Sequence, residues 1–286
     1  MESELVYSGG LLTALTVLFA VCILVPVMFY VWTVYRRRMN HVAILAGVAA
    51  FFLFGYLLAE NLLRLLAPTG SYAAMGMWPY ALVRALSVAV SEVLGITAGL
   101  WFLHRQGHTT LRVPNGLGLG FRLFEMFYLG AVSALIRLVY VMSVNRDGLA
   151  AVLAEVDETQ RTALELQLRS LAEGSVGNYW MSAVDYICRF IVPVVLARLI
   201  WYAFEGGREQ EDRRFVAIAF GLDFACELML ALHDAGGSYH LCAAIYYVIV
   251  AGMVCLLYAV SKRRDDPRMI HADHLKDRNI PRRRRY

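Results

Sequence analysis

Residues 10–35, with the sequence GLLTALTVLFAVCILVPVMFYVWTVY, contain no charged side chain. An α-helix rises about 1.5 Å per residue, so roughly 20 consecutive apolar residues cross the hydrocarbon core of a bilayer. The preceding MESELVYSGG is acidic, and the apolar stretch is longer than the hydrophobic region of a signal peptide and has no small-residue cleavage site after it. We therefore expect residues 10–35 to remain in the protein as a membrane-spanning helix.

Six further apolar stretches have the length of a membrane-spanning helix. They are residues 41–66, 79–104, 116–144, 178–204, 215–233 and 239–261. The whole chain of 286 residues is 59% hydrophobic and 17% charged, with a mean hydropathy of +0.54. These values exclude a soluble globule and a disordered chain, and five cysteines are too few for a disulfide-stapled fold. The sequence predicts an all-α, polytopic membrane bundle of about seven transmembrane helices.

The long connection at residues 146–177 contains LAAVLAEVDETQRTALELQLRSLAEG, in which apolar residues recur at helical spacing. This pattern predicts an amphipathic helix on the outer face. It is either a strut that packs on the bundle or a gate for a substrate or partner. We expect residues 1–264 to form a single transmembrane domain and residues 265–286 to form a basic cytoplasmic tail.

Arginine and lysine are concentrated in every other connection between the predicted spans. In membrane proteins, an excess of these residues is typical of short cytoplasmic loops. The positions concerned are Arg36, Arg37, Arg38, Arg105, Arg112, Arg208, Arg213, Arg214, Lys262, Arg263 and Arg264. The protein is thus expected to be a multi-pass protein of the cell membrane, with its N-terminus outside and its C-terminus in the cytoplasm. The tail ends with four consecutive arginines, residues 282–285, which predicts contact with anionic lipid headgroups and not with nucleic acid.

Ten acidic and arginine side chains fall within the third to sixth predicted spans, where an unpaired charge is costly and commonly functional. They are Arg84, Glu92, Arg122, Glu125, Arg137, Asp185, Arg189, Arg198, Asp223 and Glu227. Counting from the cytoplasmic ends places the carboxylates of Glu92, Glu125, Asp223 and Glu227 roughly 12–18 Å deep. Four acids from three helices are therefore expected to share one layer of the membrane.

This layer has two interpretations. It is either a salt-bridge network that fixes the register of the helices, or a polar, water-accessible cavity that serves as a general base or an ion site. The pair Asp223 and Glu227 favours the cavity, because the two acids repel each other on one helix face. We take Glu92 and Glu125 as candidate catalytic residues. The candidate binding residues are Arg122, Asp185, Arg189, Asp223 and Glu227.

The sequence identifies no cofactor. No histidine falls in the middle of a predicted span, so a histidine-rich metal site is not expected, and the five cysteines show no CxxC spacing. The glycine-rich stretch at residues 115–120 has no phosphate-binding spacing, and close helix packing is its better explanation.

Three groups of residues resemble motifs of the YhfC-type intramembrane proteases, which are related to the CAAX-protease, bacteriocin-processing and PrsW proteases. The first is Ser91-Glu92, with Gly95 where the family has an arginine. The second is GLGFRLFE at residues 118–125, in which Phe121 replaces a histidine. The third is Asp185, followed by Pro193 where another histidine is expected. The resemblance covers residues 11–232 and identifies the chain as a divergent member.

The resemblance implies a glutamate that activates water to hydrolyse a peptide bond in or near the membrane, with a membrane protein or peptide as substrate. Glu92 and Glu125 would supply the base, and the missing histidines argue for a catalytically silent member. The alternative is a non-catalytic binding or transport module, in which the carboxylate layer binds a cation or a basic ligand. The sequence leaves both functions open.

Overall fold

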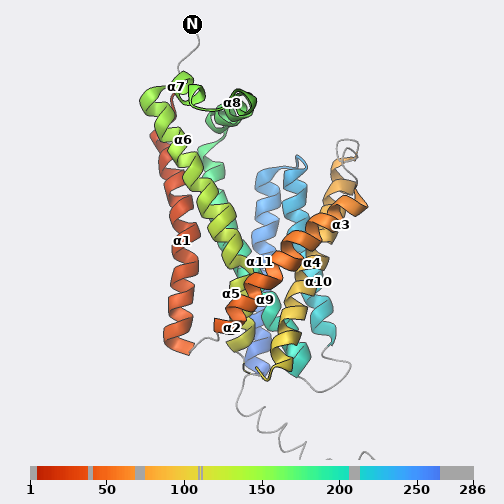
Figure 1. Ribbon diagram of the computed structural model, residues 1–286. Helices are drawn as coiled ribbons and strands as arrows, with labels where there is room; N and C mark the ends of the chain where they lie inside the picture. Colours follow the sequence, from red (N-terminus) through yellow and green to blue (C-terminus); the bar gives the residue numbers. More distant parts are fainter. Residues whose placement is uncertain are drawn as a thin grey trace, which may run out of the picture.

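The computed structural model describes residues 5–37, 41–67, 75–108, 110, 112–205 and 213–264 (Figure 1). These residues form helices and no strand, which confirms the all-α prediction. In chain order the helices are α1 (Gly9–Arg37), α2 (His41–Ala50), η1 (Phe51–Leu58), α3 (Ala59–Leu66), α4 (Met77–Arg105), α5 (Arg112–Phe124), η3 (Glu125–Val132), α6 (Ser133–Asp147), α7 (Leu149–Ala154), α8 (Glu158–Glu173), α9 (Val176–Glu205), α10 (Arg213–Asp234) and α11 (Tyr239–Arg264). The predicted tail lies outside the described residues.

Within the described residues, seven helices are long and apolar enough to cross a membrane, as predicted. Two of them contain a turn of π-helix: η1 joins α2 to α3, and η3 joins α5 to α6. Large apolar side chains such as Leu45 and Val248 are exposed on the outside of the bundle. This surface is suited to contact with lipid and not with water.

Helix α9 is the central element of the bundle, because it packs against α1, α4, α5, α10 and α11. Helices α1 and α6 pack together on one side, and α4, α10 and α11 form the other side (Figure 1). Helix α4 lies along α10, and α2 lies along α5. Residues of α4, α5, α9 and α10 thereby meet in the middle of the molecule.

The predicted amphipathic segment consists of two short helices, α7 and α8, instead of one, and they cover the ends of α1 and α6 (Figure 1). Leu168 and Leu171 of α8 are buried in a cluster with Tyr7 and Leu15. The Tyr7 hydroxyl donates a 2.9 Å hydrogen bond to the carbonyl of Leu168, and burial raises the pKa of Tyr7 to about 12. These contacts favour a strut over a gate.

Glycines bring α5 into backbone contact with its neighbours. A Cβ atom on Gly120 would collide with the carbonyl oxygen of Ile44 in α2, and one on Gly118 would lie 2.6 Å from the Cα atom of Val194 in α9. Small residues at helix crossings allow this close approach in membranes. The structure thus confirms that the glycine-rich stretch serves close helix packing.

We predict that Gly120→Ala lowers the stability of the protein by about 3 kcal/mol, because the added methyl group has no space and forces α2 and α5 apart. Gly221→Ala on α10 is the matched control, since a Cβ atom there meets nothing within 4 Å. This control should leave stability unchanged or raise it by up to about 1 kcal/mol, through helix propensity. Thermal unfolding in detergent micelles measures both, and equal melting temperatures for the two variants would contradict the assigned packing.

Candidate functional site: a buried carboxylate centre

Helix α4 presents small residues to its neighbours, with Ala81, Ala85 and Ala89 one turn apart and fully buried. This face lets α10 approach closely, so that Glu92, one turn further along, is enclosed between helices. Only 2% of the Glu92 side chain is exposed. The local sequence thus places a carboxylate in the interior of the bundle.

Arg122 of α5 joins the acids of three helices. Its Nη2 atom donates to Oε1 of Glu92 at 2.6 Å and lies 3.6 Å from Oε1 of Glu227 in α10. Its Nη1 atom donates to Oε2 of Glu125, three residues further along its own chain. A guanidinium group can hold several carboxylates at once because its donors form a rigid fork.

Glu125 is held by two arginines. Arg122 contacts its Oε2 atom, and Nη1 of Arg189 in α9 lies 3.4 Å from its Oε1 atom. Glu125 is also the first residue of the π-helix η3, a feature that is frequent at functional sites. Arg189 makes one long contact with Glu125, and 35% of its side chain is exposed. Arg189 thus forms a partly accessible rim beside the buried ion pairs.

Asp223 and Glu227 lie one turn apart on α10 and face Glu92 across the α4–α10 contact. Oxygen atoms of these three residues lie within 4.8 Å of one another, and we call the group the carboxylate centre. Asp223 is 0% exposed, whereas 15% of the Glu227 side chain is exposed. The structure thus brings together the candidate residues Glu92, Arg122, Glu125, Arg189, Asp223 and Glu227.

Three buried oxygens of the carboxylate centre have no hydrogen-bond partner: Oε2 of Glu92 and both carboxylate oxygens of Asp223. A buried, unsatisfied polar atom is costly, and more so when its group carries a charge. Helix packing alone gives no account of these atoms. They single out the carboxylate centre as the candidate functional site.

The charges around the centre do not cancel. The four carboxylates of Glu92, Glu125, Asp223 and Glu227 face the two guanidinium groups of Arg122 and Arg189, which leaves a formal charge of −2 on these six residues. A buried excess charge is expensive in a medium of low dielectric constant. Protons or a bound cation must neutralise it.

The candidate binding residue Asp185 lies apart from the centre, although it precedes Arg189 by one turn of α9. Its oxygens accept hydrogen bonds from the hydroxyls of Tyr247 at 2.8 Å and Tyr239 at 3.1 Å. Sequence reasoning missed both tyrosines. Their only signal is the spacing of two helical turns on an apolar span, since a phenol at membrane depth needs a partner.

Two other arginines singled out from the sequence serve separate contacts. Arg84 of α4 forms a 2.6 Å ion pair with Asp234 at the end of α10. Arg198 donates from Nη2 to the hydroxyl of Tyr202 at 3.2 Å. Neither contact involves the carboxylate centre.

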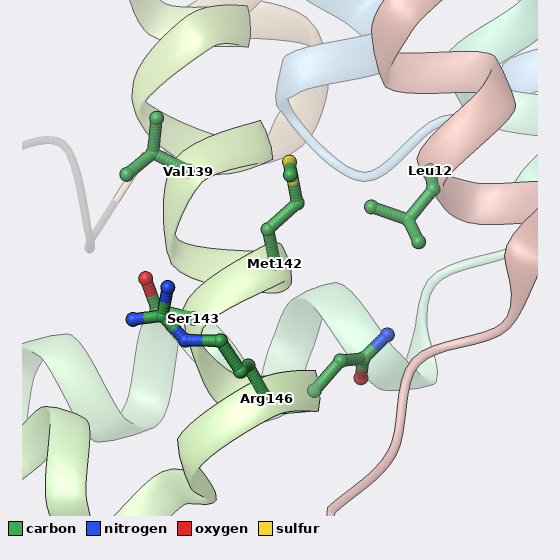
Figure 2. A pocket seen from close by; sticks show the side chains of 6 residues that line it. Leu12, Val139, Met142, Ser143 and Arg146 are labelled. Atoms are coloured by element: carbon green, nitrogen blue, oxygen red, sulfur yellow. The ribbon is translucent and has the colours of Figure 1, made fainter.

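A cavity of about 470 Å³ lies elsewhere, between α1 and α6 (Figure 2). Leu12 approaches it from α1, and Val139, Met142, Ser143 and Arg146 from α6 (Figure 2). Arg146 is engaged by its neighbour Asp147 at 2.7 Å. The lining holds no carboxylate and no group suited to acid–base chemistry, so this cavity is not the candidate site.

The family model for YhfC, described as an intramembrane metalloprotease, matches residues 21–254. The chain belongs to the YhfC intramembrane metalloprotease family. No curated protein and no solved structure matched the chain. The matched residues include the helices that carry the carboxylate centre and the arginines around it.

The family description implies a metal ion, and the residues of this YhfC protein fit one that prefers oxygen ligands. The carboxylate centre offers three side chains that can each supply an oxygen, and two of them have unpartnered oxygens. Carboxylates suit magnesium, manganese and calcium. The described histidines, His41, His104, His108, His233 and His240, are not part of the group.

Phe121 stands where the family resemblance places a histidine, and its surroundings are apolar. The ring is fully buried and packs edge-on against Phe51, with centroids 5.5 Å apart. Cβ atoms on Gly55 and Gly95 would lie 3.3 and 3.2 Å from it. The YhfC chain thus fills this position with an aromatic ring, and the polar chemistry remains with the acids and arginines.

We predict that Arg122→Met destabilises the YhfC protein by about 3–5 kcal/mol, because Glu92 then loses its buried cation. Arg64→Met is the control, since Arg64 pairs with Glu60 at 3.1 Å on an exposed surface, where such a pair contributes less than about 1 kcal/mol. Thermal unfolding in micelles measures both changes. Adding Glu92→Gln and Glu125→Gln to the Arg122 variant should recover part of the loss. An Arg122 variant as stable as the wild type would refute the assigned network.

Proposed function

We propose that this YhfC-family protein hydrolyses a peptide bond within or near the membrane, with Glu92 taking a proton from the attacking water and returning it to the leaving amine as the C–N bond breaks. The observation that carries the proposal is the contrast between the two oxygens of Glu92. Oε1 accepts from Arg122 at 2.6 Å, while Oε2 is buried without a partner. A general base needs one fixed orientation and one free lone pair within hydrogen-bond distance of water.

The two arginines and Glu125 have supporting roles in this proposal. Arg122 orients Glu92, and Glu125 in turn holds Arg122 and Arg189 in place. Hydrolysis develops negative charge on the peptide oxygen, which positioned donors stabilise. Arg189 is the group proposed to donate to that oxygen, because its guanidinium group is partly exposed and makes one long contact. Glu125 is thus a positioning residue.

Asp223 and Glu227 complete the proposed site from the opposite helix. Their oxygens lie within 4.8 Å of an oxygen of Glu92, so that all three residues surround one small volume. A water molecule in that volume would have the carboxylate of Glu92 on one side and the carboxylates of Asp223 and Glu227 on the other. A metal ion bound by these carboxylates would supply polarisation of a carbonyl group and a more acidic water.

A non-catalytic binding or transport module is the second candidate function. It is supported by the two unpartnered oxygens of Asp223 and by the apolar setting of Phe121. Such a module would bind a cation or a basic ligand at the carboxylate centre and cleave nothing. The measurement of cleavage described below separates it from the protease.

We also propose the orientation of the chain in the cell membrane. The ends of α4 and α11 and the starts of α5 and α10 lie at the end of the bundle opposite α7 and α8 (Figure 1). These helix ends carry Arg105, Lys262, Arg112 and Arg213. Basic residues favour the cytoplasmic side. The end of the bundle that carries α7 and α8 then lies outside the cell, and the basic tail, residues 265–286, meets anionic lipid in the cytoplasm.

Cells that express the wild type should accumulate membrane-protein fragments with new N-termini in or beside apolar segments. Glu92→Gln should reduce these fragments by about 10²–10⁴-fold, the usual contribution of a general base. Glu165→Gln is the control, since Glu165 pairs with Arg169 on the surface of α8. Mass spectrometry of N-terminal peptides measures the fragments, and thermal unfolding checks that both variants fold. Undiminished cleavage by the Glu92 variant would exclude Glu92 as the base.

The orientation is tested with cysteines introduced one at a time into a background in which all five native cysteines are replaced by alanine, because Cys255 is exposed and Cys188 is partly exposed. A membrane-impermeant maleimide should label Glu173→Cys in intact cells, since Glu173 ends α8. It should label Gln106→Cys, just beyond α4, only after the cells are permeabilised. The reverse pattern would place the N-terminus in the cytoplasm.

A further inference from the structure

We propose that Glu92, Asp223 and Glu227 form an all-carboxylate binding site for one divalent metal ion that prefers oxygen ligands. The inference deepens the proposed function, because it names the cofactor class of the same site and rests on that function for the catalytic use of the ion. Binding itself requires no cleavage. It can therefore be measured separately.

The spacing of the oxygens suits a shared ion. Magnesium–oxygen bonds are about 2.1 Å long and calcium–oxygen bonds about 2.3–2.6 Å, so ligands on opposite sides of one ion lie roughly 4–5 Å apart. The oxygens of the carboxylate centre lie within 4.8 Å of one another. Three ligands from two helices can thus meet one ion without a movement of the backbone.

Asp223 provides the second, independent observation. Its side chain is 0% exposed, and neither of its oxygens has a hydrogen-bond partner. A carboxylate buried without partners is among the costliest groups a protein can contain, whereas a bound ion satisfies both its charge and its lone pairs. The position of Asp223 beside two further acids is explained by a cation.

Arg122 and the ion can bind Glu92 together. Arg122 occupies Oε1 of Glu92, and Oε2 is left without a partner. One carboxylate can therefore bridge the guanidinium group and the ion, with Arg122 fixing the direction of the ligand. Hydrogen bonds of this kind orient metal ligands and tune the affinity for the ion. A carboxylate oxygen has two lone pairs, so Oε2 can bind the ion with one and keep the other for the water of the proposed reaction.

The charge and the enclosure both favour a small divalent ion over an organic cation. The six charged residues around the centre carry a formal charge of −2, which one divalent ion neutralises. Glu92 and Asp223 are 2% and 0% exposed, so a small ion fits between their carboxylates more readily than a bulky ammonium group. Glu227, the most exposed member, marks the side from which a hydrated ion would enter.

The proposed path of the ion to Glu227 follows one face of α10. Asp234 lies seven residues after Glu227, about 10 Å along the helix and on the same face. It forms a partly exposed ion pair with Arg84 of α4. Acidic side chains thus extend from the end of the bundle that carries the α10–α11 turn toward the carboxylate centre.

The experiment uses the purified, full-length protein in micelles, stripped with a chelator and titrated with manganese(II). The loss of the electron paramagnetic resonance signal of free manganese counts bound ions, and one per chain is expected. Electron spin-echo spectroscopy of the bound ion should show no nitrogen coupling, because the ligands are carboxylates. Magnesium, manganese and calcium should each raise the melting temperature in a saturable manner. No bound manganese, or coupling to histidine nitrogen, would overturn the proposal.

Two variants separate binding from folding. Asp223→Asn should abolish manganese binding, yet in the chelated protein it should melt at the wild-type temperature or above, because it removes an unpartnered buried charge. Asp185→Asn is the control: Asp185 is also an acid on a membrane-spanning helix, but it is only partly buried and its oxygens already accept from two tyrosines, so this variant should bind one ion. Binding retained in the Asp223 variant would overturn the site.

The outcomes distinguish the two proposals. Manganese binding that depends on Asp223, in a protein that cleaves nothing, would support the ion site and reject the protease. Cleavage that depends on Glu92 and persists in excess chelator, in a protein that binds no manganese, would reject the ion site and support the protease.

Discussion

The guanidinium group of Arg122 is the interaction on which the interior of this protein depends. It contacts Glu92 of α4, Glu125 at the start of η3 and Glu227 of α10. At membrane depth these carboxylates are shielded from bulk water, so their charges must be compensated by cations or protons inside the bundle. The convergence of the helices is therefore required by electrostatics as well as by packing. Because a buried ion pair is costly to assemble, its presence suggests a use beyond stability.

Close packing makes this convergence feasible. The alanines of α4 bring α10 near, and Gly118 and Gly120 bring α5 against α9 and α2. Long side chains at these crossings would hold the helices apart, and the short reach of a carboxylate would then fail to span the gap. These alanines and glycines have no reactive side chains, yet they allow the close helix packing that brings Glu92 near Asp223.

The sequence predicted the seven spans and the shared depth of the acids, because both follow from counting residues along helices. It did not predict which acid meets which arginine. Asp185 and Arg189 share a helix face, yet Arg189 lies against Glu125 and Asp185 against two tyrosines. Those choices depend on the rotation and tilt of neighbouring helices, which leave no trace in a one-dimensional pattern. The helical spacing of the leucines in the outer segment likewise did not predict that the segment divides into α7 and α8.

The setting of Phe121 shows that the missing histidine is not an isolated change. A histidine in its place would set an imidazole against the ring of Phe51 and beside Gly55 and Gly95, neither of which carries a polar side chain. An arginine in place of Gly95 would collide with Phe54, since even a Cβ atom there lies 2.7 Å from that side chain. The apolar ring and the two glycines are therefore mutually dependent. With an apolar ring in this corner, the polar side chains of the interior are the acids and arginines of α4, α5, η3, α9 and α10 that surround Arg122.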